Sequence, residues 1–145
     1  MRQYLLDSAV LSAYLRGRAA TLAMTQPWIH VGEATTSMVC VGEVSEYLKG
    51  FPDYPTHWQA FRTLLMKVHP YPLTYAIGQR YGEVRRMLRP PHGPGLIGDI
   101  DTLIAATALE YNMTLVSTDS DFQRVPGLSL RWLPPGALRS EMPQS

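Results

Sequence analysis

The stretch Gln3-Tyr4-Leu5-Leu6-Asp7-Ser8 decides the fold, because an apolar run without alternation ends there in a carboxylate. Such a run is typical of a strand that is buried on both faces of a parallel sheet. Asp7 or Ser8 can cap the following helix, in which Val10, Leu11 and Tyr14 recur at helical spacing. The pattern therefore predicts a β-strand that leads directly into an α-helix.

The rest of the chain also contains residue patterns that predict strands and helices. Residues 89–98 (RPPHGPGLIG) cannot be helical, because proline and glycine interrupt them throughout. The apolar spacing predicts strands over residues 114–117 and 128–133, and helices over residues 18–25, 38–49, 57–68, 75–88 and from Asp99 or Asp101 to Asn112. The order of strand, helices and strand favours an α/β fold with a parallel sheet flanked by helices.

Length and composition indicate one compact domain. The chain has 145 residues, of which 46% are hydrophobic, enough to bury a core. We predict a single domain over residues 1–133 and a C-terminal tail over residues 134–145. The single cysteine, Cys40, excludes an intrachain disulfide and fits a reducing cytoplasm. Since Asp7 interrupts the first apolar run, we expect a cytoplasmic protein without a membrane segment.

Positive charge is concentrated in the middle of the chain, although the formal net charge is only +1. Between Tyr54 and Gly98 the only acidic residue is Glu83. Four arginines in this stretch are candidates for contacts with a nucleic-acid backbone or with an acidic partner: Arg80, Arg85, Arg86 and Arg89. A solvated helix face is the alternative explanation for each of them.

Acidic residues mark the candidate site: Asp7, Glu43, Asp101 and Asp119, with Asp99 and Asp121 close by in sequence. Ligands bind at the carboxyl ends of parallel strands, where Asp7 and Asp119 are expected. Clustered carboxylates repel one another unless a cation neutralises them, and Mg²⁺ and Mn²⁺ prefer oxygen ligands. Each aspartate also has a structural explanation, as a helix cap, a turn residue or a partner of a helix dipole.

Four motifs resemble the PIN-domain family and, within it, the VapC-like toxin ribonucleases of type II toxin–antitoxin systems. They are Leu5-Leu6-Asp7-Ser8, Val41-Gly42-Glu43-Val44, Ile97-Gly98-Asp99-Ile100-Asp101-Thr102-Leu103-Ile104-Ala105-Ala106 and Leu115-Val116-Ser117-Thr118-Asp119. The third is the most specific, because its acid, Asp101, lies three residues before Ile-Ala-Ala. The resemblance runs in order from Tyr4 to Trp132.

This resemblance implies a PIN-like sheet of about four to five strands and a Mg²⁺- or Mn²⁺-dependent endoribonuclease that hydrolyses RNA phosphodiesters. It implies that Asp7, Glu43, Asp101 and Asp119 are catalytic, and that Asp7, Asp101 and Asp119 bind the metal. Supporting roles fall to Ser8, Ser117, Asp99 and Asp121. The resemblance also implies a homodimer and a cognate antitoxin protein.

Some features depart from the family, and other functions remain open. Ala9 stands where the family often has a polar residue, and residues 51–88 carry no matching motif. A PIN-like interaction module with an inactive site and a nuclease acting on other nucleic acid are the alternatives. A receiver-type signalling module is disfavoured, since it needs a lysine after a late strand and the only lysines are Lys49 and Lys67.

Overall fold

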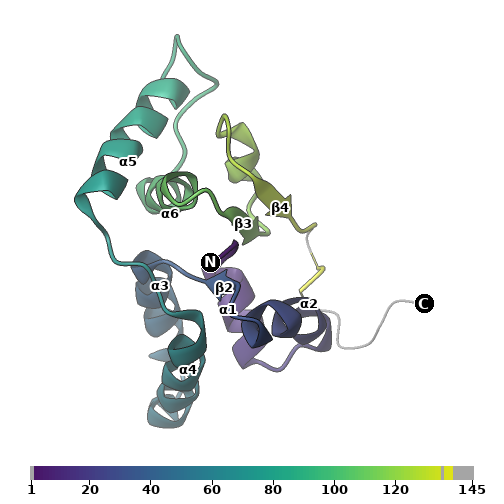
Figure 1. The fold of residues 1–145 in the computed structure, drawn as a ribbon. Coiled ribbons are helices and arrows are strands. Elements are labelled where there is room, and N and C mark those ends of the chain that lie inside the picture. Colours follow the sequence, from purple (N-terminus) through teal and green to yellow (C-terminus); the bar gives the residue numbers. More distant parts are fainter. Residues whose placement is uncertain (1, 135, 139–145) are drawn as a thin grey trace.

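A computed structural model of the protein describes residues 2–134 and 136–138 (Figure 1). Four strands are present within this part of the chain: β1 (Tyr4–Leu6), β2 (Ala34–Thr35), β3 (Thr114–Ser117) and β4 (Leu130–Trp132). The helices are α1 (Ser8–Leu15), α2 (Ala19–His30), α3 (Met38–Leu48), α4 (Tyr54–Val68), α5 (Tyr75–Leu88), α6 (Asp99–Glu110) and the 3₁₀ helix η1 (Ser120–Arg124).

The strands form one parallel sheet in the order β2-β1-β3-β4, which confirms the predicted fold class. β1 pairs with β3 in the register Leu6 to Val116, so their carboxyl ends lie side by side. Because β1 and β3 are the two central strands, the residues that follow them come together at one edge of the sheet. The fold therefore places Asp7 next to residues 117–119.

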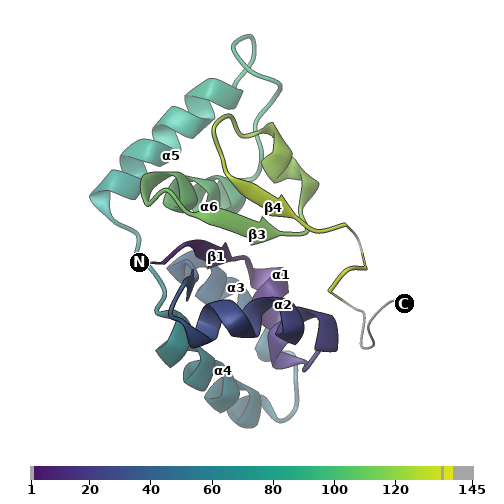
Figure 2. The same ribbon diagram turned by 45° about the vertical axis from the view of Figure 1, so that its right-hand side comes forward.

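Helices cover the sheet from both sides (Figures 1 and 2). Helices α5 and α6 lie on one side of the strands and α1 to α4 on the other. The central strands are fully enclosed: Leu5 and Leu115 are inaccessible to solvent, and Leu6 and Val116 are nearly so. This burial explains why neither strand alternates apolar and polar residues.

Several predicted element boundaries were wrong. Helix α2 continues past Pro27 to His30, whereas the proline was expected to end it. Proline deprives the carbonyl of residue i−4 of its partner, and here that residue, Ala23, lies on the exposed face of the helix. Helix α4 begins at Tyr54 rather than after Thr56, because Pro55 fits the first turn of a helix. The predicted turn after Ser117 is a 3₁₀ helix, η1.

The end of the chain is described only in part. Residues 135 and 139–145 of the expected tail lie outside the described residues, so the division into a domain over 1–133 and a tail stays a prediction. Leu138 packs against the hydrophobic core, and its carbonyl accepts a hydrogen bond from Thr21 Oγ1 at 3.4 Å. None of the helices within residues 2–134 and 136–138 has the length and apolar character needed to cross a membrane.

Candidate active site

Asp7 is the most firmly held of the predicted site residues. It ends β1, caps α1 and is only 6% exposed. Ser117 at the end of β3 donates a hydrogen bond to Asp7 Oδ2 at 2.6 Å, and the Ser8 backbone N–H donates to Oδ1 at 2.8 Å. Both carboxylate oxygens are thus fixed by donors from two adjacent segments, which orients Asp7 before any ligand arrives.

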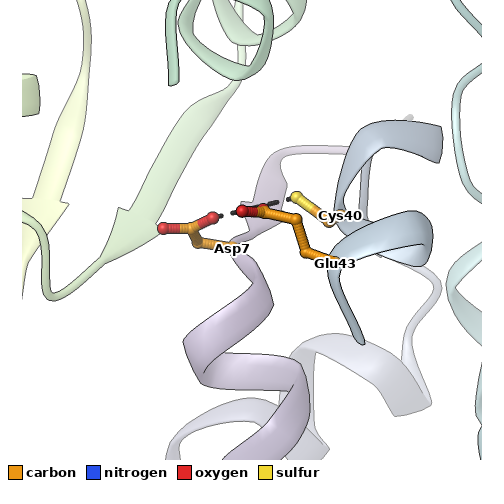
Figure 3. Close-up of side chains that lie close together, drawn as sticks. All are labelled: Asp7, Cys40 and Glu43. Atoms are coloured by element: carbon orange, nitrogen blue, oxygen red, sulfur yellow. Dashed lines mark hydrogen bonds between the residues drawn. The ribbon is translucent and has the colours of Figure 1, made fainter. Parts of the chain in front are cut away.

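Glu43 and Cys40 extend from α3 toward Asp7 (Figure 3). The Cys40 thiol donates to Asp7 Oδ1 at 3.8 Å, and the Ser8 side chain forms a hydrogen bond with the partly exposed Glu43. One ligand atom from each of Asp7, Cys40 and Glu43 lies within 4.8 Å of the others. Ser8 therefore contacts two of the predicted acids, through its backbone and through its side chain.

A second acidic group comes from α6 and η1. Asp101 lies in the first turn of α6, while Asp119 caps η1 and accepts a hydrogen bond from the Asp121 N–H at 2.9 Å. Ligand oxygens of Asp101, Asp119 and Asp121 lie within 4.8 Å of one another. Ser117 joins this group to Asp7, because its Oγ accepts from the Asp119 N–H at 3.0 Å.

Electrostatic repulsion links the two groups into one site. Burial raises the pKa of Asp7, and Asp119 raises it further. Burial also raises the pKa of Glu43, with Asp7 adding to the effect. The pKa of Asp101 rises to about 7, through burial first and then through the charge of Asp119, a hydrogen bond with Asp119, and the charges of Asp7 and Glu43. The structure thus brings Asp7, Glu43, Asp101 and Asp119 together.

The donor set fits a hard divalent cation. Carboxylate oxygens from four elements converge, and the raised pKa values of Asp7, Glu43 and Asp101 indicate that uncompensated negative charge is unfavourable there. Mg²⁺ and Mn²⁺ match oxygen ligands of this kind. Burial raises the pKa of the Cys40 thiol, so it is protonated in the metal-free protein, and its soft sulfur is a poorer match for Mg²⁺ or Mn²⁺ than the carboxylates are.

Asp99 does not join these acids. Its carboxylate accepts from Arg85 at 2.8 Å and from the Tyr81 hydroxyl at 3.2 Å, both on α5. The side chain is 72% exposed and directed away from Asp101, two residues along the same helix. Residues two apart on a helix do not share a face, which explains the separation.

The four predicted nucleic-acid-binding arginines fall into two kinds. Arg80 pairs with Glu83 at 3.1 Å and Glu110 at 3.3 Å, and Arg85 pairs with Asp99. Arg86 and Arg89 are exposed and form no ion pair with any of residues 2–134 and 136–138. Two of the four cations therefore serve internal contacts between α5 and α6.

Two site contacts were missed from the sequence. Cys40 lies three residues before Glu43 on α3, a spacing that predicts a shared helix face and would have revealed its approach to Asp7. Arg124 donates to Asp121 at 2.9 Å. That pair could have been inferred only from the 3₁₀ helix, which the sequence did not predict.

The comparisons with known proteins agree with this geometry. The PIN domain family model matches residues 4–128, and the chain belongs to the PIN-domain family. A search of curated proteins finds no match.

Several solved structures share the fold. A chain of the crystal structure of VapBC2 from Rickettsia felis, bound to a DNA fragment from their promoter, superposes with a TM-score of 0.79 at 20% identity, covering 90% of this chain and 98% of that one. DNA-bound VapBC from Salmonella typhimurium gives 0.78 at 13% identity, covering 90% and 98%. FitAcB from Neisseria gonorrhoeae gives 0.76 at 18% identity, covering 91% and 98%.

Proposed function

We propose that this protein is a Mg²⁺- or Mn²⁺-dependent endoribonuclease and the toxin component of a toxin–antitoxin pair. The observation that carries the proposal is the convergence of Asp7, Glu43, Asp101 and Asp119 at the carboxyl edge of the sheet, where burial and then the charge of neighbouring acids raise the pKa of Asp7, Glu43 and Asp101. Membership of the PIN-domain family and the fold shared with chains of VapBC structures support it.

In this proposal Asp7, Asp101 and Asp119 hold the cation, and Asp121 braces Asp119 through its backbone N–H. A bound Mg²⁺ or Mn²⁺ would supply Lewis acidity toward the phosphate and lower the pKa of a coordinated water. Glu43 is partly exposed beside Asp7 and has a raised pKa, so its carboxylate is suited to accept the proton of the attacking water. Ser117 and Ser8 keep Asp7 and Glu43 oriented.

The test is cleavage of single-stranded and structured RNA in Mg²⁺ or Mn²⁺, compared with cleavage in excess chelator. Asp7→Asn and Asp101→Asn should each reduce cleavage by at least about a thousandfold. Asp53→Asn is the matched control, because Asp53 is an exposed carboxylate that caps α4 and pairs only with His57 among the described residues. Unchanged cleavage in both site variants would contradict the assignment.

A DNA oligomer of the same sequence is a second arm of this assay. Faster cleavage of DNA than of RNA would favour the nuclease acting on other nucleic acid. A wild-type protein that cleaves neither polymer but still binds a protein partner would favour the interaction module.

We also propose a cognate antitoxin as partner, which docks in an apolar groove between α3 and α4. This groove of about 530 Å³ is lined mainly by apolar side chains, with one arginine and one histidine: Met38, Val41, Trp58, Arg62, Leu65, Met66, His69 and Pro70. Inhibition of cleavage by the product of the neighbouring gene, abolished by Met66→Glu, is the expected result.

A homodimer acting in the cytoplasm completes the proposal. Large apolar side chains remain exposed on the segment between α4 and α5, where Leu73 is 54% and Tyr75 is 93% exposed. A second copy of the chain would cover such side chains. Light scattering of the purified protein, with Tyr75→Lys for comparison, tests this point.

A further inference from the structure

A positively charged side chain lies directly beside the acidic residues. Arg124, the last residue of η1, donates a hydrogen bond from Nη2 to Asp121 Oδ1 at 2.9 Å. A carboxylate oxygen of Asp121 in turn lies within 4.8 Å of ligand oxygens of Asp101 and Asp119. A single carboxylate therefore separates the guanidinium group of Arg124 from two of the residues to which we assign the metal.

The partner of Arg124 distinguishes it from the paired arginines of α5. Arg80 and Arg85 form ion pairs with carboxylates of α6 that lie outside the acidic site, so they join two helices. Arg124 pairs with a carboxylate of the acidic group itself. A phosphate that approaches these acids is repelled by them and attracted by the guanidinium group of Arg124.

The stability of the fold depends little on this ion pair. The side chains of Arg124 and Asp121 are 37% and 45% exposed. Ion pairs that are this accessible to water stabilise a protein only weakly, because solvent screens the charges and ordering the side chains costs entropy. The main effect of the pair is therefore to hold the guanidinium group beside the acids.

The guanidinium group retains donors for a second anion. Arginine carries five N–H donors in one plane, and Arg124 forms no hydrogen bond other than the one to Asp121 with the residues that the structure describes. A Cβ atom added at Gly95 would lie 3.6 Å from Nη1. The φ of 127° at Gly95 favours glycine, so the chain passes close to Arg124 without a side chain to cover it. Arg124 can therefore donate to a phosphate oxygen while it stays paired with Asp121.

The segment beside Arg124 leads to further positive charge. It connects α5 to α6 and passes η1 (Figures 1 and 2). The Gly95 N–H donates to the carbonyl of Leu88, the last residue of α5, at 2.8 Å. Arg86 and Arg89, which are exposed, lie at this same end of α5. Through these contacts Arg124 connects the acidic site with the two arginines that form no ion pair among the described residues.

We propose that Arg124 binds a backbone phosphate of the RNA substrate at the edge of the acidic site, with Asp121 holding its guanidinium group in place. This role rests on the nuclease function proposed above. The planar fork of arginine matches the oxygens of a phosphate, and its charge offsets part of the repulsion between the acids and the RNA backbone. Arg124 is thus a substrate-binding residue, whereas the acids hold the cation.

The test compares RNA binding by wild type, Arg124→Ala, Arg124→Lys and the double variant Arg124→Ala/Asp121→Asn, which has the net charge of wild type. Fluorescence anisotropy of a labelled single-stranded RNA of about ten nucleotides, in chelator and at several salt concentrations, gives the affinity and its salt dependence. Arg131→Ala is the matched control, because Arg131 is an exposed arginine on β4 that lies over the ring of Trp28, 5.4 Å from its centroid.

Arg124→Ala should bind the RNA about tenfold more weakly than wild type, because a hydrogen-bonded contact to a charged group is lost. The logarithmic slope of affinity against salt should be shallower by about 0.7, the value for one phosphate contact with a single strand. The double variant should remain weaker than wild type, because neutralising Asp121 does not replace the contact. Arg124→Lys should keep the slope but bind more weakly than wild type, since lysine has the charge without the planar fork.

Metal binding separates this role from support of the metal ligands. Removing a positive charge beside the acids should leave the Mn²⁺ affinity of Arg124→Ala unchanged or raise it, because like charges repel. If Arg124 served instead to position Asp119 and Asp121, the same substitution would lower the Mn²⁺ affinity. Calorimetric titration of the two proteins with Mn²⁺ alone measures the direction of the change.

Four results would overturn the proposal. The first is an Arg124→Ala variant with the RNA affinity and salt slope of Arg131→Ala. The second is wild-type affinity in the double variant, which would show that Arg124 only neutralises Asp121. The third is weaker Mn²⁺ binding by Arg124→Ala, and the fourth is unchanged RNA binding with weaker capture of the antitoxin.

The lysine variant decides the matter if the alanine variant does not fold, since wild-type affinity in Arg124→Lys would contradict a contact that needs the guanidinium fork. Failure of the nuclease proposal is recognised separately. A wild-type protein that cleaves no RNA in Mg²⁺ or Mn²⁺ would end that proposal, while the binding measurements in chelator still show whether Arg124 contacts RNA. Cleavage by wild type with RNA binding that does not depend on Arg124 would end only the role of Arg124.

Discussion

The two acidic groups of the site are held in different ways. Asp7 is buried and accepts hydrogen bonds from Ser117, the Ser8 backbone and Cys40, so donors surround its carboxylate. Asp101 is partly exposed, and the charged groups that act on it are the acids Asp119, Asp7 and Glu43, with Asp119 in hydrogen-bond contact. Asp7 is preorganised by the protein, whereas the negative charge of Asp101 meets mainly other acids among the described residues and is favoured by a bound cation. Within one site, therefore, hydrogen bonds fix the position of the Asp7 carboxylate, whereas the protonation of Asp101 responds to the charge of its neighbours.

Removing the support of Asp7 should have the largest effect. Ser117→Ala deletes the donor to Asp7 and the acceptor of the Asp119 N–H, so we expect cleavage to fall by about 10- to 100-fold. The unfolding free energy should fall by about 1.5–3 kcal/mol, because a buried hydrogen bond to a charged group is lost. Steady-state kinetics and urea denaturation measure the two changes.

Ser129→Ala provides the control for this substitution, since Ser129 is exposed and shares its hydroxyl with Thr114 on the surface. It should change neither quantity. Equal losses in both serine variants would contradict the claim that the hydrogen bond from Ser117 to Asp7 supports activity and stability.

The proton on Asp101 should make metal binding depend on pH. With a pKa of about 7, this carboxyl is protonated below neutrality, and a cation must displace the proton. The apparent metal affinity should therefore fall about tenfold per pH unit below pH 7 and level off above pH 8. Metal titrations followed by calorimetry at pH 6, 7 and 8 measure this dependence, and a flat profile would contradict the raised pKa.

Stability without metal should change in the opposite sense. The pKa of Asp101 lies above its ordinary value of 3.8, so between these values the folded protein holds a proton that the unfolded chain has released. Stability is then highest at low pH within this window and falls as pH rises through 7. We expect a lower Tm at pH 8 than at pH 6 in chelator, with Mg²⁺ or Mn²⁺ reversing the difference.

Replacing Asp101 and Asp7 in turn by asparagine separates the effect of relieved charge repulsion from the effect of lost hydrogen bonds. At pH 8 without metal, Asp101→Asn should raise Tm by about 2–5 °C, because it relieves repulsion from Asp119. Asp7→Asn should lower Tm, since an amide cannot accept from both Ser117 and the Ser8 N–H. Thermal denaturation distinguishes them, and a rise in Tm for both variants would show that Asp7 is also mainly under charge strain.

The smallest effect is expected at Cys40. Cys40→Ala removes a protonated thiol that contributes one long hydrogen bond to Asp7, so cleavage should stay within about threefold of wild type. Pre-treatment of the wild type with a thiol reagent should likewise leave activity intact, because the side chain is buried. A loss of cleavage activity comparable to that of Ser117→Ala would show that the Cys40 thiol, like Ser117 and the Ser8 N–H, is needed to orient Asp7.

The spacing of apolar and capping residues predicted those elements whose formation depends mainly on neighbouring residues in the sequence. The buried run that ends at Asp7 and the helix over residues 75–88 follow from neighbouring residues alone, and the structure shows both of them. The meeting of β1 and β3 followed from the behaviour of parallel strands. Those rules place Asp7 and Asp119 at one edge of the sheet.

Contacts between helices could not be predicted in this way. The direction of Asp99 depends on how α5 packs against α6, and the ion pairs of Arg80 and Arg85 depend on the same packing. The groove lined by Ala9, Ser12, Tyr47 and Thr118 depends on the distance between α1, α3 and the segment after β3. Each requires tertiary geometry that spacing along a single element does not contain.

The central position of β1 has a consequence for the timing of activity during synthesis. Asp7 is translated first, yet its backbone N–H is satisfied by Val116 and its carboxylate by Ser117, more than a hundred residues later. A ribosome-bound chain that has not yet released β3 carries Asp7, Glu43 and Asp101 without the strand that brings Ser117 and Asp119 to them. If the protein cleaves RNA as proposed, the nascent polypeptide would gain this activity only after β3 and Asp119 have emerged.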